Sequence, residues 1–198
     1  MRAAALVIGV ISIAGCSFPP FGRSPVVRFR GEGTDPIGDT AHIADARVAR
    51  PADLIYARVE VTDATLRLAV RFAPRTLDSA TTGAEFLLDT DLDPETGQRD
   101  PGIGVDYAVS LHAGPRRGAT LSRAVTDVGC TTPCRFEPFT RADILLSNDQ
   151  MEATFPRSAL AKFDGRLNFR VVAYANVGRQ TATSDHLPNL PAQFVAVR

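Results

Sequence analysis

The sequence predicts an all-β protein, an antiparallel β-sandwich of jelly-roll-like type with one short helix. Three observations point to this class. Apolar and polar residues alternate with a period of two over many short segments, turn-forming residues separate these segments, and only one segment carries helix signals. A chain of 198 residues with 44% hydrophobic residues is large enough for one such core. We therefore expect a single sandwich domain.

The chain is expected to divide into three parts. Residues 1–15 read as an export signal, because Arg2 is followed by an apolar run that is shorter than the roughly 20 residues needed to span a bilayer. Residues 16–33 are rich in Pro, Gly and Arg, show no periodicity and are expected to form a flexible tether. Residues 34–198 contain the expected strands and form the sandwich domain.

The end of the signal, Ile13-Ala14-Gly15-Cys16, resembles the lipobox of bacterial lipoproteins. The resemblance implies that Cys16 is the acylated first residue of an exported, lipid-anchored protein of the cell envelope. Several acyl chains would make this anchoring effectively permanent. Because Ser17 follows where lipoproteins of the inner membrane often have Asp, the outer membrane is expected if the cell has one. An ordinary secretory signal with a free cysteine is the alternative.

The first expected strands form a hairpin, residues 55–61 and 66–72, whose apolar residues alternate with polar ones around a turn at Thr62-Asp63-Ala64. Residues 84–89 are apolar on both faces except at Glu85, which favours a central strand covered on both sides. Further strands are expected at residues 105–111, 119–126, 142–147, 150–155, 167–176 and 193–197.

Two later segments are expected to differ from strands. Residues 156–163 predict a brief helix, because Pro156 suits a first helical turn and Gly165 suits a C-terminal stop. The tail from Ser184 to Pro191 is rich in turn-forming residues and predicts a loop.

An acidic loop follows the expected central strand. It carries four carboxylates, at Asp89, Asp91, Asp93 and Glu95. Carboxylates this close repel one another unless they are solvated or a hard cation such as Ca²⁺ holds them together. An EF-hand is excluded, because Pro94 stands where that loop needs a glycine and the flanking segments predict strands.

We expect this loop to hold a structural Ca²⁺. The expected ligands are Asp89, Asp91, Asp93, a carbonyl at Gly97, and Asp106 from the next strand. The alternative is a solvated turn, in which the aspartates accept hydrogen bonds from nearby backbone groups. Both interpretations stay open at the level of sequence.

Cys130 and Cys134 are expected to form a local disulfide, because export places them in an oxidising compartment. No second Cys or His pair lies nearby in the sequence, so a zinc site has little support. A redox-active pair is the alternative.

Several motifs together resemble secreted bacterial β-sandwich domains of the carbohydrate-binding family 9 and DOMON-like group. They are Asp35-Pro36 with Gly38-Asp39, the run from Phe86 to Gly97, Gly104-Val105-Asp106-Tyr107, and Asp185 with Pro188-Asn189. The resemblance implies a jelly-roll-like sandwich with a structural Ca²⁺ and a capacity to bind sugar. Sugar-binding members use an aromatic platform, often of tryptophan. This chain has no Trp, so Tyr56, Tyr107 and Tyr174 are its nearest substitutes.

The expected function is a non-catalytic binding module whose partner is a glycan or an envelope protein. DOMON relatives that bind haem use Met and His ligands, so a haem-binding electron-transfer module is one alternative, with Met151 and His42, His112 or His186. A structural envelope protein with no small-molecule ligand is another. No nucleophile elbow or zinc-hydrolase motif indicates an enzyme, and a net charge of +0 gives no general attraction to nucleic acid.

Overall fold

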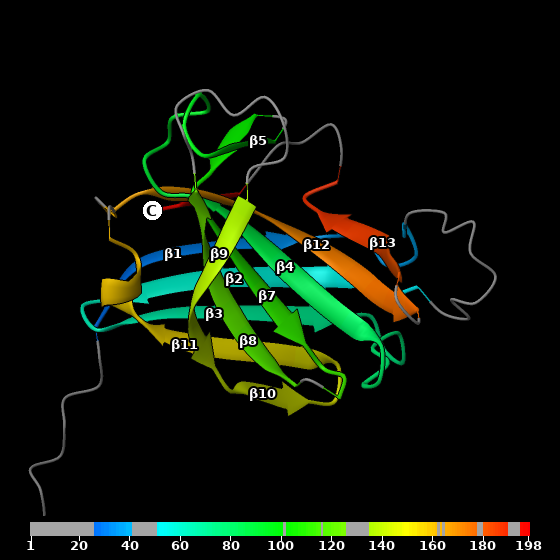
Figure 1. Ribbon diagram of the computed structural model, residues 1–198. Helices are drawn as coiled ribbons and strands as arrows, with labels where there is room; N and C mark the ends of the chain where they lie inside the picture. The colour runs from blue at the N-terminus through cyan, green and yellow to red at the C-terminus, as the bar shows by residue number, and fades with distance from the viewer. Residues whose placement is uncertain are drawn as a thin grey trace, which may run out of the picture.

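The computed structural model describes residues 26–40, 51–100, 102–115, 117–125, 135–161, 163, 165–177, 180–189 and 195–198. Two antiparallel sheets pack face to face (Figure 1). The first has the order β1 (Val27–Thr34), β2 (Leu54–Thr62), β3 (Thr65–Phe72), β11 (Gln150–Pro156), β10 (Ile144–Ser147). The second has the order β13 (Gln180–Leu187), β12 (Leu167–Val177), β4 (Thr82–Asp89), β7 (Tyr107–His112), β8 (Gly118–Val125), β9 (Arg135–Ala142).

Three shorter strands complete the fold. Strand β14 (Val195–Val197) pairs with β12. Strands β5 (Gln98–Asp100) and β6 (Ile103–Val105) form a separate two-stranded hairpin inside the acidic loop. This hairpin lies at one end of the sandwich, above the ends of β4 and β7 (Figure 1). The antiparallel sandwich predicted from the sequence is confirmed.

The core lies between the two sheets and receives large side chains from both. Phe72 and Phe155 come from the first sheet, Phe86 and Phe169 from the second, and all four are fully buried. The rings of Phe86 and Phe169 lie 5.9 Å apart on neighbouring strands. Burying a large apolar side chain contributes roughly 1.5–3 kcal/mol relative to leaving it exposed. The alternating apolar residues seen in the sequence therefore supply the stabilisation that joins the sheets.

The predicted hairpin is β2–β3, with Val61 opposite Leu66. The predicted central strand is β4, which lies between β12 and β7. Its outer face is less covered than expected, because Glu85 and Leu87 are only half-buried. On the other side of the loop, Tyr107 is buried as the alternation predicts.

The boundary between tether and domain is corrected by the structure. Residues 27–33, assigned to the tether, belong to β1, which pairs with β2. The backbone of Arg30 also exchanges hydrogen bonds with that of Arg198, at 3.0 and 3.3 Å. β1 is an edge strand whose side chains are mostly exposed, so it shows no apolar alternation. Backbone pairing, which leaves no side-chain pattern, decides its structure.

Two further expectations change, and one strand was not expected. The predicted helix at 156–163 is a single 3₁₀ turn, Arg157–Ala159, because β11 runs on through Pro156. The predicted loop at 184–191 begins later, because β13 extends to Leu187. Strand β9 was not predicted; Pro138 interrupts its pattern, which an edge strand tolerates.

No helix among the residues that the structure describes is long and apolar enough to cross a membrane. The proposed signal, Cys16, His42, Cys130 and Cys134 lie outside the described residues. The expected lipidation and disulfide therefore stay predictions.

Candidate metal centres

The acidic loop brings three carboxylates together. Asp89 is the last residue of β4, and Asp106 stands between β6 and β7. The amide of Asp106 donates to the carbonyl of Leu88 at 2.9 Å. This bond holds the last residue of the loop against the end of β4. One carboxylate oxygen from each of Asp89, Asp91 and Asp106 lies within 4.8 Å of the others. This group is the loop cluster.

Hydrogen bonds within the loop orient the carboxylates. The amide of Leu92 donates to Asp89 Oδ1 at 2.8 Å. The amide and the hydroxyl of Thr90 both donate to Asp106 Oδ2 at 2.8 Å. Because a carboxylate offers about four lone-pair positions, these bonds fix the side chains and leave capacity for a cation.

The carboxylate of Asp91 is also held by hydrogen bonds from residues of the loop. It accepts the amide of Asp93 at 3.0 Å and the hydroxyl of Thr96 at 3.1 Å. It is exposed, whereas Asp89 is buried. The loop cluster is therefore open to solvent at Asp91 and closed at Asp89.

Two predicted ligands do not belong to the loop cluster as carboxylates. Asp93 is exposed and accepts the amide of Glu95 at 2.9 Å, as in a capped turn. Gly97 has a φ of +64°, and a Cβ added there would lie 2.4 Å from the carbonyl oxygen of Val105. Its observed role is a tight turn packed against β6. Metal ligation by Asp93 or by the Gly97 carbonyl stays a prediction.

The electrostatics of the loop cluster favour a counter-charge. Asp89 is 1% exposed, and burial raises the pKa of its carboxyl to about 6. The charges of Asp106 and Asp91 raise that pKa further, against the hydrogen bonds from Leu92 and Gly104. Two like charges 4 Å apart repel by about 4 kcal/mol at an effective dielectric constant of 20. Three converging oxygen donors fit a hard cation such as Ca²⁺.

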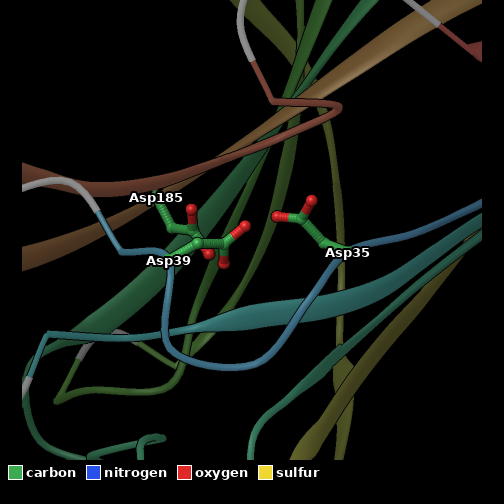
Figure 2. A group of neighbouring side chains, drawn as sticks. All are labelled: Asp35, Asp39 and Asp185. Carbon is green, nitrogen blue, oxygen red and sulfur yellow. The ribbon is translucent and has the colours of Figure 1, made fainter.

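A second group of carboxylates lies at the edge formed by β2 and β13. Asp35 and Asp39 flank the turn after β1, and Asp185 lies on β13. One carboxylate oxygen of each lies within 4.8 Å of the others. Figure 2 shows the three side chains approaching one another from these two segments. We name this group the edge cluster.

Backbone and side-chain bonds hold the edge cluster in place. Asp185, which is 1% exposed, accepts the amide of Leu54 at 2.6 Å and that of His186 at 2.8 Å. The side-chain amide of Asn189 donates to Asp35 Oδ1 at 2.9 Å and also to Asp39 Oδ2. The edge cluster therefore joins the first sheet, through β1 and β2, to the second, through β13.

Asp53 lies next to the edge cluster and is also buried, at 3% exposure. Its Oδ2 accepts the amide of Gly38, inside the turn between Asp35 and Asp39, at 2.8 Å. Its charge acts on the carboxyls of both Asp35 and Asp185. Four carboxylates thus share one region of the protein.

Two carboxyls of the edge cluster, those of Asp35 and Asp185, resist ionisation. Burial, followed by the charges of Asp39, Asp185 and Asp53, raises the pKa of Asp35 to about 7. Burial also raises the pKa of Asp185 to about 6, although two amides donate to it. No arginine or lysine contributes to either pKa among the residues that the structure describes.

The edge cluster was not predicted as a site. Asp35, Asp39, Asp185 and Asn189 were noted only as parts of a family resemblance, and Asp53 was not singled out. The signal in the sequence was the co-occurrence of short acidic motifs near both ends of the domain. Nothing in their spacing indicated that they meet.

Several residues considered for haem or sugar binding are buried or are hydrogen-bonded to other parts of the protein. Met151 is fully buried in the hydrophobic core. His112 Nδ1 lies 3.0 Å from the hydroxyl of Tyr174, which is itself buried. Tyr107 is also buried, and its hydroxyl accepts the amide of Ala161 at 3.1 Å.

Tyr56 differs from the other two tyrosines because it is only half-buried. Its hydroxyl donates to Glu32 at 2.8 Å, and the guanidinium of Arg71 lies 5.5 Å from the centre of its ring.

Comparisons with protein-family models, curated proteins and solved structures gave no match for this chain.

Proposed function

We propose that this protein is a calcium-stabilised, non-catalytic binding module of the cell envelope, held at the membrane by a lipid on Cys16. The observation that carries the proposal is the convergence of Asp89, Asp91 and Asp106 in the acidic loop. Without a cation, the charges of three carboxylate oxygens so close together repel one another, against the hydrogen bonds that hold them. A Ca²⁺ at that point replaces repulsion with attraction and fixes the loop.

The position of the loop explains why a cation there would stabilise the sandwich. The loop connects β4 and β7, which are neighbours in the centre of the second sheet. Asp106 precedes β7 and is bonded to two other strands: its amide donates to the carbonyl of Leu88 on β4, and its carbonyl accepts the amide of Ala124 on β8 at 2.8 Å. A cation bound to Asp89 and Asp106 would therefore clamp the end of β4 to the start of β7.

The partner is proposed to be a glycan or an envelope protein. Tyr56 is the one described tyrosine with an exposed part, so a sugar-binding surface would lie on the outer face of the first sheet. Screening the full chain against plant and bacterial polysaccharides tests the glycan. Binding that is lost in Tyr56→Ala supports it, and a blank screen together with co-purification of an envelope protein favours the protein partner.

The calcium site is tested by thermal melting in chelator and in 10 mM Ca²⁺. At a Ca²⁺ concentration 100 times the dissociation constant, binding adds about 2.7 kcal/mol to the free energy of unfolding. For a domain of this size, this raises the melting temperature by roughly 5–10 °C. Asp91→Asn is expected to lower this response, since it removes one charged ligand and leaves a hydrogen-bond acceptor in place.

Asp63→Asn is the control, because Asp63 is an exposed aspartate outside the acidic loop and is paired with Arg28. It should keep the full response to Ca²⁺. If Ca²⁺ raises the melting temperature of Asp91→Asn as much as that of the wild type, or raises neither, the loop is only a solvated turn and the proposal fails.

A further inference from the structure

The edge cluster differs from an ordinary group of surface acids because, in it and in the neighbouring Asp53, buried oxygens have no hydrogen-bond donor among the described residues. Asp35 Oδ2, Asp39 Oδ1 and Asp53 Oδ1 are buried and accept no hydrogen bond from any part of the chain that the structure describes. Asp53 is 3% exposed, so solvent does not compensate for the missing donors. A buried polar group without a partner destabilises the folded state, and a charged group does so more strongly.

The surroundings of these oxygens indicate what is missing. Asp53 Oδ2 accepts the amide of Gly38, within the turn that joins Asp35 to Asp39, and the charge of Asp53 acts on both Asp35 and Asp185. Figure 2 shows the carboxyl group of Asp35 directed toward those of Asp39 and Asp185. The group that would satisfy all of them is positively charged and small.

We propose that the edge cluster is a second divalent-cation site, which takes Ca²⁺ and joins the two sheets. The ligands are one oxygen each from Asp35, Asp39 and Asp185, with Asp53 as a fourth carboxylate beside them. This site does not depend on the one proposed in the acidic loop, since the two share no residue.

Asn189 supplies a fifth oxygen after a small rearrangement. Its Nδ2 now donates to both Asp35 and Asp39, at the place where the two carboxylates meet. Rotation of the side-chain amide by half a turn exchanges the two atoms and places Oδ1, which can bind a cation, where Nδ2 now donates. Asp185 keeps its bonds to Leu54 and His186, because each carboxylate oxygen has a second lone pair.

The donor set selects the ion by its chemistry. Carboxylates and an amide carbonyl are hard oxygen ligands, and Ca²⁺ accepts six to eight of them in irregular arrangements, with water completing the shell. Mg²⁺ demands near-octahedral geometry at shorter distances and keeps most of its water. Ligands that come from a turn, a strand and a loop on two sheets suit the more tolerant ion.

The experiment counts Ca²⁺ ions by isothermal titration calorimetry on the full chain, freed of metal and held at pH 7.5. The wild type is expected to bind two ions. Asp39→Asn should lower the affinity of one site at least tenfold and leave the other, and Asp91→Asn should do the reverse. Asp63→Asn is the control: Asp63 is an exposed aspartate paired with Arg28, and its loss should leave both sites unchanged.

The variants separate the two sites. Two ions bound with unchanged affinity in Asp39→Asn would overturn the proposal, as would a wild type that binds a single ion lost in Asp91→Asn. Should Asp39→Asn fail to fold, Asp35→Asn carries the same test, and circular dichroism of each variant identifies a folding defect. A wild type that binds one ion lost in Asp39→Asn, and not in Asp91→Asn, would support the edge site and overturn the one in the loop.

Discussion

The loop cluster and the edge cluster each bring three aspartates within 4.8 Å, but they reach that arrangement differently. The loop cluster comes from one segment, residues 89–106, whose own backbone amides hold its carboxylates. The edge cluster joins residues as distant as Asp35 and Asn189, 154 positions apart. The first is a property of a local segment, and the second exists only after the two sheets have packed.

The difference extends to hydrogen bonding. The carboxylates of the loop cluster accept amides from within the loop, so the loop is preorganised before any cation binds. In the edge cluster Asp35 and Asp39 each have a buried oxygen that accepts no hydrogen bond from the residues that the structure describes. We therefore expect the edge cluster to depend more on a bound cation, or on a proton, than the loop cluster does.

The largest expected contrast comes from two glycines, one in each region. Gly97 has a φ of +64° and no room for a Cβ, whereas Gly38 has a φ of +91° with nothing within 4 Å of an added Cβ. A left-handed backbone costs an alanine roughly 1–2 kcal/mol. Gly38→Ala should lose about that much. Gly97→Ala adds a backbone clash and should lose about 3 kcal/mol, a fall of roughly 6–12 °C in melting temperature.

Thermal melting of both variants in chelator checks this order. Gly97→Ala should also weaken the Ca²⁺ response of the loop, because Gly97 packs against the backbone that leads to Asp106. Equal melting temperatures for the two variants would show that the loop is not as tightly packed as the structure indicates.

A smaller effect is expected from pH, and it concerns both regions. The folded-state pKa is raised from 3.8 to about 7 for Asp35 and to about 6 for Asp89 and Asp185. Between pH 4 and pH 7 these three carboxyls therefore bind more protons in the folded protein than in the unfolded chain, so their contribution to stability falls as the pH rises. In chelator, the melting temperature should be lower at pH 7.5 than at pH 5.

Ca²⁺ should reverse or flatten this trend, since it binds the ionised carboxylates. Melting curves at a series of pH values, with chelator and with Ca²⁺, make the comparison. Asp35→Asn should remove part of the fall seen in chelator, because it removes the carboxyl with the highest pKa of the three. A melting temperature in chelator that rises steadily from pH 5 to pH 7.5 would contradict the assignment of raised pKa values.

The smallest expected effect is that of Asp53→Asn on the melting temperature, which should be opposite in sign in chelator and in Ca²⁺. Asp53→Asn removes one charge from the edge cluster, and its side-chain carbonyl can still accept the amide of Gly38. In chelator at pH 7.5 this should stabilise the protein by about 1 kcal/mol, a shift of roughly 2–4 °C. In Ca²⁺ the variant should melt below the wild type. Shifts of the same sign in both conditions would argue against a cation in the edge cluster.

Much of the fold was predictable because its signal is local. The alternation in β2, β3 and β7 is a property of consecutive residues, and burial of one face follows directly from it. β1 and β9 were missed for the opposite reason. They are edge strands with mostly exposed side chains, so their structure rests on backbone pairing that leaves no pattern in the sequence.

Strand pairing also explains why the predicted helix is not formed. Pro156 and Gly165 are local signals for a helix start and stop, but β11 continues through Pro156, and the turn that follows it is the short 3₁₀ segment Arg157–Ala159. Pairing of β11 with β3 extends to Pro156 opposite Thr65. Tertiary contacts therefore decided where the strand ended.

The antiparallel sandwich and the acidic loop could be predicted from the sequence, because the apolar alternation and the spacing of Asp89, Asp91 and Asp106 lie within short segments. The edge cluster depends on the packing of the whole domain. Asp35 and Asp185 meet because the core packs one sheet on the other and places β13 beside the start of β2, where Leu54 donates to Asp185. That position depends on the fold of the whole domain, and no local pattern encodes it.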